Sequence, residues 1–246
     1  TPGLAVLTNG LLAEGAGSWD AGQIAERLDK VGAVLGNGAL RDMAWVSLRS
    51  LTEPALLTPA LQTLREILIA PSFPGDALER ERQRLQVLLA EQAQQPSTQA
   101  ELAFYQAVYR EHPYAVPVWG NPESVAQLTR SQVQGFYQRY YVAQNATLAL
   151  VGALDRAQAE ALATQLLAGL PSGAAAPDLP AVPPPAPTVV KQSFPASQTH
   201  LWLGQALALR TDPDYPALYL ANHILGGAGL SSRLSQAVRE QRGLAY

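Results

Sequence analysis

The side chains best suited to chemistry lie in the last twenty-one residues of the chain. Arg239 and Tyr246 are seven positions apart, and a glycine-rich segment with Gly226, Gly227 and Gly229 precedes them. A guanidinium and a phenol hydroxyl can together polarise a carbonyl group and stabilise the oxyanion that develops on it. The preceding sequence shows no nucleophile or metal site that such a pair would assist. These residues therefore resemble one half of an active site.

The same residues also have ordinary structural interpretations. Gly243 is typical of a glycine at the C-terminal end of a helix, which places Arg239 in the last turns of that helix and Tyr246 at the start of a strand. Residue types alone favour a surface arginine and a half-buried strand tyrosine. The glycine-rich segment opens a helix, whose N-terminus could bind an anion or a carbonyl oxygen. Its spacing nevertheless favours a flexible turn between two helices.

Histidine and cysteine offer little to a metal ion. The chain has three histidines, His112, His200 and His223, and the closest two are 23 positions apart. Catalytic zinc needs three protein ligands, and the usual helical solution places two histidines on one face of a helix. The absence of cysteine excludes disulfides, thiolate ligands and cysteine nucleophiles. A zinc site would require isolated residues to converge from distant parts of the chain.

Composition predicts a globular protein with a substantial core. Of 246 residues, 48% are hydrophobic and 15% are charged. The net charge of −3 gives no basic field for nucleic acid, so no nucleic-acid partner is expected. No apolar run reaches the roughly 18–20 residues that a membrane span needs, so no span is expected.

Hydrophobic periodicity and capping residues predict mixed helices and strands. Asp20, Thr129 and Asp155 are N-cap candidates, and Thr129 and Asp155 are each followed three positions later by glutamine. The expected helices cover 19–35, 53–70, 76–95, about 98–110, a segment after Thr129, a segment after Asp155 to about 170, 215–225 and 231–242. The expected strands cover 43–48, 147–152, 189–194 and 200–208, and the strand at 147–152 is expected to be buried.

A change of composition suggests a domain boundary. Residues 171–188 contain seven prolines and no helical period, which is typical of a semi-rigid linker. We therefore expect a first domain over 1–170, a linker over 171–188 and part of a second domain over 189–246.

Several motifs, in the same order and at matching spacing, resemble the pitrilysin/insulinase superfamily of zinc metallopeptidases, and in particular its processing-peptidase-like branch. The segment HPYAVPVWG at 112–120 and the segment NATLALVG at 145–152 are similar to the signature of its first domain. The segments GLSSRL at 229–234 and GLAY at 243–246 are similar to that of its second. The resemblance implies an α+β fold, in which each domain has a mostly antiparallel sheet with helices on one face. It also implies that the first domain here lacks its first strands and that the second is incomplete.

The sequence departs from the resembled family at its zinc motif. The family carries H-x-x-E-H soon after a Gly-Leu-Ala-type start, and here the three positions are Val6, Asn9 and Gly10. The distal glutamate region resembles the sequence around Glu91, although a lone carboxylate on a charged helix face has a plain surface interpretation. Valine, asparagine and glycine offer no imidazole ligand and no general base. The resemblance therefore implies a homologue that lacks the family zinc and does not cleave peptides by itself.

The resemblance also assigns a role to the C-terminal pair. In the family, an arginine and a tyrosine of the second domain reach the substrate near the scissile bond, and these roles fall on Arg239 and Tyr246. Some members divide the work between a zinc-bearing chain and a chain that keeps only this pair. We expect this chain to bind peptide and support a zinc-bearing sister subunit, or a second copy of itself. An alternative is a structural or assembly subunit, and a third is a zinc peptidase with unorthodox ligands. Exported relatives favour the periplasm over the cytoplasm.

Overall fold

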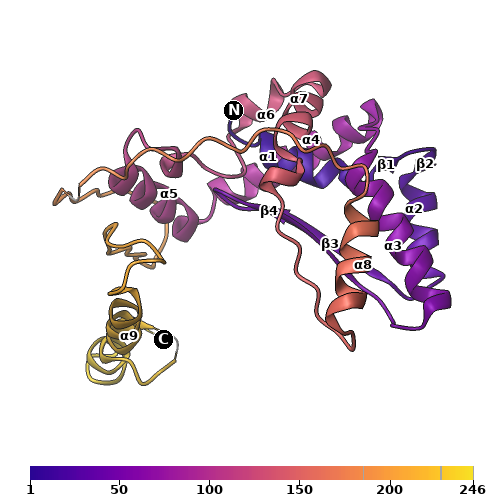
Figure 1. Ribbon diagram of the computed structural model, residues 1–246. Helices are drawn as coiled ribbons and strands as arrows, with labels where there is room; N and C mark the ends of the chain where they lie inside the picture. Colours follow the sequence, from indigo (N-terminus) through magenta and orange to yellow (C-terminus); the bar gives the residue numbers. More distant parts are fainter. Residues whose placement is uncertain (185, 228, 246) are drawn as a thin grey trace. The chain divides into compact units, whose positions relative to one another are not determined.

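The computed structural model describes residues 1–184, 186–227 and 229–245 (Figure 1). Contacts between residues divide the chain into two compact units, Thr1–Leu203 and Gly204–Tyr246. The predicted domain boundaries at 170 and 188 both fall inside the first unit and stay predictions.

The first unit is mixed helix and small antiparallel sheets, which confirms the α+β class. Its elements in chain order are α1 (Leu4–Gly10), η1 (Leu11–Ala13), β1 (Gly15–Ala16), β2 (Trp19–Asp20), α2 (Ala21–Asp29), β3 (Val34–Ala39), β4 (Ala44–Arg49), α3 (Pro54–Ile69), α4 (Gly75–Ala93), α5 (Pro96–Tyr109), η2 (Pro113–Ala115), α6 (Pro122–Ala126), α7 (Arg130–Tyr140), η3 (Ala143–Asn145) and α8 (Arg156–Leu167).

Local capping explains where several helices begin. Helices α2, α7 and α8 each start with a reciprocal pair of hydrogen bonds between an N-cap side chain and a glutamine: Asp20 with Gln23, Thr129 with Gln132, and Asp155 with Gln158. Proline occupies the first position of α3 and α5, where its missing N–H costs nothing. These helices confirm the predictions, but α2 ends earlier than expected because Gly32 takes a positive φ of 63° and leads into β3.

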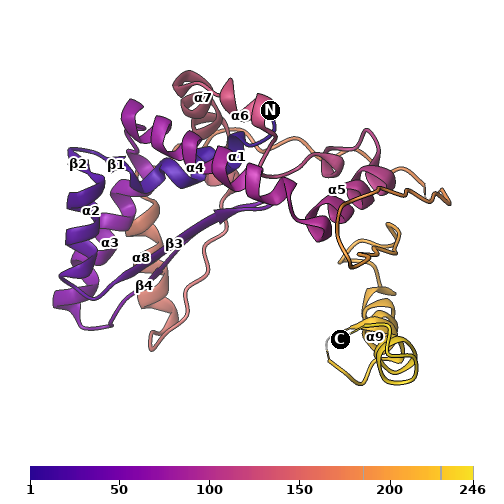
Figure 2. The same ribbon diagram turned by 180° about the vertical axis from the view of Figure 1, so that it is seen from behind.

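The main sheet is the hairpin of β3 and β4, which run antiparallel with Leu35 opposite Leu48 and Asn37 opposite Val46 (Figure 2). Strand β4 confirms the strand that was predicted at 43–48. Leu35, Val46 and Leu48 are partly buried and pack against the core, so one face of the hairpin covers hydrophobic side chains.

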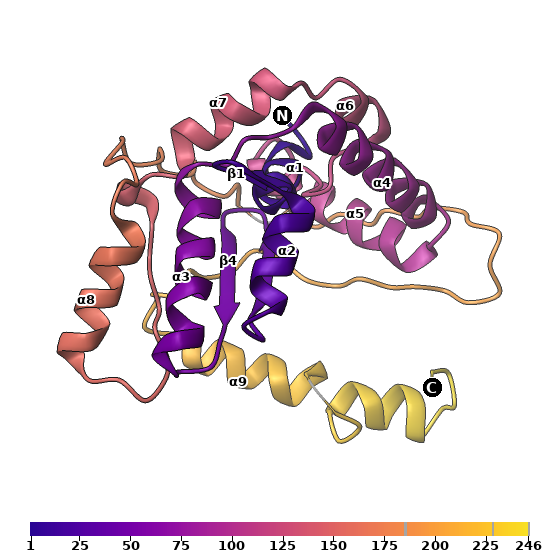
Figure 3. The ribbon, with the colours of Figure 1, turned by 90° about the vertical axis from the view of Figure 1, so that its right-hand side faces the viewer.

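Helix α1 lies at the centre of the core. It contacts the hairpin, α4 and α7, while α3 contacts both α2 and α8 (Figure 3). Leu7 on α1 and Leu85 on α4 are almost completely buried, as is Val133 on α7. A short helix with this burial is held by tertiary packing, because seven residues are too few for a stable isolated helix in water.

Three predicted strands are wrong within the described residues. Segments 147–152, 189–194 and 200–208 form no strand there, and 147–152 is largely exposed rather than buried. Val151 is 99% exposed and Leu203 is 91% exposed. The cause is physical: an extended segment becomes a strand only when a neighbouring backbone pairs with it, and residue types do not reveal whether that neighbour is present.

The second unit contains α9 (Tyr215–Gly226), as predicted, and the π-helical segment η4 (Ser235–Glu240). The helix that was expected over 231–242 is therefore shorter. Ser232 accepts a hydrogen bond from the Ser235 backbone N–H at 3.2 Å, so its hydroxyl helps to start this segment. Across both units, no helix among the described residues has the length and apolarity to cross a membrane.

Candidate functional site

The three positions at which the family zinc motif is lost, Val6, Asn9 and Gly10, lie together on α1. Val6 and Asn9 are buried, at 8% and 1% exposure, and Gly10 is half-buried. Val6 and Gly10 are four residues apart and so lie on the same side of the helix. The fold thus places these residues where packed helices and the hairpin meet.

Asn9 makes a closed set of hydrogen bonds in this position. Its Nδ2 donates to the Trp45 carbonyl oxygen at 3.2 Å and to the Tyr141 hydroxyl at 3.1 Å. Its Oδ1 accepts from Nδ2 of Asn37 at 3.0 Å. Asn37 also donates to the Asn9 carbonyl oxygen at 2.7 Å. Buried polar groups need such partners, so this amide is a satisfied structural group.

Tyr141 stays neutral in this environment. Burial raises the pKa of its phenol, and the hydrogen bond from Asn9 offsets only part of that effect. The cluster of Asn9, Asn37 and Tyr141 therefore contains amides and a neutral phenol, and none of these can serve as a general base at neutral pH.

The structure places Glu81 beside Gly10, and the assignment of Glu91 to the zinc motif stays a prediction. A Cβ added to Gly10 would lie 3.5 Å from Glu81 Oε2. Glu91 is exposed, and ten residues further along α4 correspond to about 15 Å of helix. A sequence signal for Glu81 existed: it follows Leu78 by three positions and precedes Leu85 by four, on the buried face of α4.

Glu81 already has a cationic partner. Its Oε2 accepts from Arg84 Nε at 2.9 Å and lies 2.7 Å from Arg84 Nη2. The Glu81 side chain is 18% exposed and that of Arg84 is 59% exposed, so water is partly excluded from the carboxylate but not from the guanidinium. The carboxylate therefore has a cationic neighbour within its own helix.

These residues do not fit a zinc ion. Zinc in proteins takes imidazole, thiolate or carboxylate ligands. Val6 and Gly10 supply none, Asn9 is committed to the hairpin and Tyr141, and Glu81 is paired with Arg84. Within the described residues, no group of three or more His, Cys, Asp or Glu side chains could hold a metal ion.

Arg239 lies in η4, in the second unit. Its side chain is 35% exposed, and its Nε lies 3.8 Å from Glu240 Oε1. The Gly243 N–H donates to the Arg239 carbonyl oxygen at 2.9 Å and the Leu244 N–H to that of Val238 at 3.0 Å. With φ of 62° at Gly243, this is a left-handed helix end, as predicted. Tyr246 lies outside the described residues, so its pairing with Arg239 stays a prediction.

The glycine-rich segment closes a helix. Gly226 is the last residue of α9, and the Gly227 N–H donates to the carbonyl oxygens of Asn222 and His223. A Cβ at Gly227 would come within 2.5 Å of His223 Cα, so the close approach requires glycine. The prediction that these two glycines open a helix is wrong, because their donors already serve the α9 C-terminus. Gly229 has a positive φ of 107°, which favours glycine at this position.

His112 has a structural role. It is 5% exposed, its Nδ1 accepts from the Tyr114 N–H at 3.1 Å, and its Nε2 lies 3.0 Å from the Pro180 carbonyl oxygen. The first contact requires an unprotonated Nδ1, so Nε2 carries the proton and donates. His112 therefore ties the proline-rich segment to the η2 turn.

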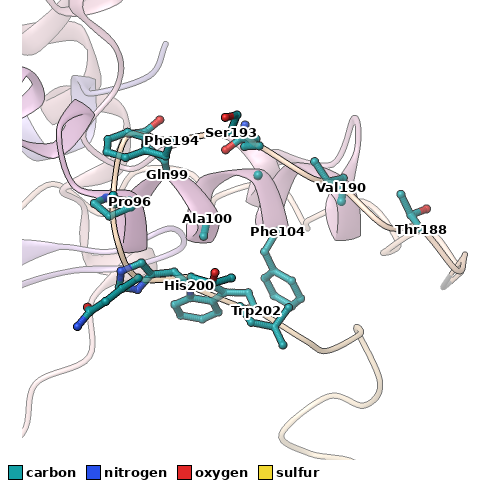
Figure 4. A pocket seen from close by; sticks show the side chains of 17 residues that line it. Pro96, Gln99, Ala100, Phe104, Thr188, Val190, Ser193, Phe194, His200 and Trp202 are labelled. Atoms are coloured by element: carbon teal, nitrogen blue, oxygen red, sulfur yellow. The ribbon is translucent and has the colours of Figure 1, made fainter. Parts of the chain in front are cut away.

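A cavity of about 380 Å³ lies between α5 and residues 188–202 (Figure 4). Phe104 and Trp202 line it, with ring centroids 5.8 Å apart. Among the predicted site residues, none lines this cavity. The cavity is therefore separate from the lost zinc motif on α1.

Comparisons with known proteins agree with these motifs. Residues 1–121 match the family model of insulinase (peptidase family M16), and residues 127–246 match the peptidase M16 inactive domain. A protein of Mycobacterium leprae named as an uncharacterised zinc protease is 30% identical over 251 residues, covering 96% of this chain and 53% of the relative. The chain thus spans about half the length of that curated relative.

Solved structures show the same fold. The crystal structure of a peptidase M16 inactive domain from Pseudomonas fluorescens is 38% identical with a TM-score of 0.92, covering 100% of this chain and 60% of that one. A protease from Helicobacter pylori is similar in fold alone, at 19% identity and a TM-score of 0.77 over 98% of this chain and 59% of that one. Because the two family models together cover nearly the whole sequence, the chain belongs to the pitrilysin or insulinase family of peptidases, M16.

Proposed function

We propose that this chain is a non-catalytic M16 member that binds peptide and supports proteolysis by a zinc-bearing sister subunit, as in heterodimeric processing peptidases. One observation carries the proposal: the position of the family's glutamate is Asn9, whose amide is buried and fully hydrogen-bonded. A second copy of the chain is the other candidate partner. A periplasmic location is part of the proposal and rests on the resemblance alone.

Arg239 and Tyr246 are the residues through which this chain would support cleavage. Arg239 and Tyr246 would donate hydrogen bonds to the carbonyl oxygen of the peptide as negative charge develops on it. In other enzymes, loss of one such donor costs about 2.7–4 kcal/mol, or roughly 100- to 1000-fold in rate. Arg239 suits this role because its side chain is partly exposed and its contact with the Glu240 carboxylate is a long one, at 3.8 Å.

Co-expression with the sister subunit tests the proposal. We expect R239A and Y246F each to lower kcat for peptide cleavage by about 100-fold or more, because an oxyanion donor is lost. R233A is the matched control, since it removes an arginine from the same segment and should leave the rate unchanged. Wild-type rates for R239A and Y246F would contradict the supporting role.

A structural or assembly subunit is the second candidate. The observation that favours it is the apolar exposure of segments without regular structure: Val151, Leu201 and Leu203 are each at least 85% exposed. Such surface is typical of protein contacts. A fluorescent-peptide titration separates the two candidates, because saturable binding supports the first and its absence supports the second.

A further inference from the structure

Two polar side chains that lie at the lost zinc motif, Asn9 and Glu81, have partners inside the protein. Asn9 donates to both β4 and the end of α7, through Trp45 and Tyr141. Glu81 binds Arg84 through two guanidinium nitrogens. The Asn9 amide therefore cannot bind a ligand without losing an existing partner, and a ligand at Oε2 of Glu81 would compete with the Arg84 guanidinium.

The ion pair of Glu81 with Arg84 bears most directly on whether a metal ion could bind here. Gly10 leaves the path to Glu81 open, since the nearest heavy atom that a Cβ would meet is Glu81 Oε2 at 3.5 Å. Arg84 supplies the positive charge that the carboxylate would otherwise seek. A metal ion at Glu81 would have to displace this guanidinium or tolerate like-charge repulsion beside it.

We infer that this position is closed to metal by internal pairing and not merely by missing ligands, and that Arg84 is the residue that closes it. Restoring the two imidazoles would then be insufficient for tight zinc binding while Arg84 holds Glu81. The inference rests on contacts within α1 and α4, so failure of the peptide-binding or sister-subunit proposal leaves it untouched.

A zinc titration of engineered chains tests this. V6H/G10H places two imidazoles four residues apart on α1, and the one at position 10 lies next to Glu81. We expect V6H/G10H/R84Q to bind zinc about tenfold more tightly than V6H/G10H, because glutamine frees the carboxylate and removes the competing charge. The readout is the dissociation constant from calorimetry with zinc chloride alone.

The matched control is V6H/G10H/R80Q. Arg80 lies one turn earlier on α4 and binds Glu14 and Asp76. It carries the same charge, but its guanidinium pairs with those two carboxylates instead of Glu81, so its replacement should leave zinc affinity at the V6H/G10H value. Equal affinity with and without Arg84, or an equal gain from R80Q, would overturn the inference.

A second pair of variants covers the case in which the V6H substitution disturbs the core, since Val6 is only 8% exposed. G10H and G10H/R84Q keep Val6 and change only the half-buried position. The same ratio of zinc affinities is expected at weaker absolute values, with circular dichroism confirming the fold. No gain on adding R84Q to folded G10H would also overturn the inference.

Discussion

Two tyrosines of this chain show how a single side chain responds to its surroundings. The Tyr114 hydroxyl donates to Asp42 Oδ2 at 2.6 Å, and this hydrogen bond, with burial second, raises the pKa of Tyr114 from 10.0 to about 12. Burial raises the pKa of Tyr137 to about 12 as well, without any carboxylate partner. The two phenols therefore resist ionisation for different reasons.

Replacing Asp42 by asparagine should separate these causes. In D42N the pKa of Tyr114 falls toward 10, because the carboxylate that disfavours tyrosinate is gone, while that of Tyr137 stays near 12. A raised pKa in the folded state adds stability below pH 10 that is lost as the pH rises from 10 to 12. Alkaline titration by tyrosinate absorbance, with denaturation at pH 8 and 11, measures both effects. An unchanged set of late-ionising tyrosines in D42N would contradict this assignment.

At the scale of elements, the β3–β4 hairpin depends on what lies beneath it. Within the described residues it is a two-stranded sheet, and a hairpin alone is marginally stable in water. Asn9 attaches both strands to α1, through Asn37 on β3 and Trp45 on β4. The same amide reaches Tyr141 at the end of α7. One side chain therefore links three segments that are distant in the sequence.

Substitutions at Asn9 should loosen this hairpin. N9L keeps a similar volume but leaves buried partners unsatisfied, which costs about 1–3 kcal/mol of unfolding free energy. N9D should cost more at pH 7, because it places a carboxylate against the Trp45 carbonyl oxygen at a site that is 1% exposed. Burial raises the pKa of the new carboxyl, so the N9D deficit should shrink on acidification. Hydrogen exchange of the β3 and β4 amides provides the measurement.

The pH dependence distinguishes the electrostatic cause from a packing defect. N9L carries no titrating group, so its deficit relative to the wild type should not vary between pH 4 and pH 7. Glu81 and Arg84 are present in every variant, so any contribution that they make to the pH dependence of stability cancels in the comparison. Wild-type hairpin protection in N9D at pH 7 would show that the amide is not needed.

At the scale of the whole molecule, the boundary between the two family models differs from the boundary between the two compact units of the structure. The two M16 models meet between residues 121 and 127, but the contact-based division falls after Leu203. The reason is visible in the packing: α6 lies against α4, and α7 lies against α1. Helix α6 thus lies between the two models and α7 lies in the second, and both complete the core of the segment that the first model matches.

A fragment that ends at residue 121, where the first family model ends, should therefore not fold cooperatively. Residues 1–121 alone lose α6 and α7, and with them the buried side chains of Val125, Leu128 and Val133. We expect this fragment to lack a cooperative unfolding transition, whereas residues 1–203 should keep one, because they contain the whole first unit. Thermal unfolding by circular dichroism compares the two. Cooperative melting of 1–121 would show that the first model is an independent domain.

Much of the fold was predictable because its signals are local. The capping pairs at Asp20, Thr129 and Asp155 lie within four residues of sequence, and each begins a helix as expected. The strands expected at 147–152 and 200–208 failed because pairing depends on a distant backbone. The proximity of Glu81 to Gly10 was not predictable for a related reason: it depends on how α4 packs against α1. The assignment of Glu91 stays a prediction.

The amino-acid sequence by itself determined the family, the α+β class and the loss of the H-x-x-E-H ligands, since these depend on residue identity and short-range order. Only the tertiary structure decided what replaced those ligands. Asn37, Trp45 and Tyr141 lie 28 to 132 positions from Asn9 in sequence, and folding alone brings them within hydrogen-bond distance of its amide. Arg84 and Glu81 are only three residues apart and pair within α4. Their ion pair lies beside Gly10 only because α1 and α4 pack together.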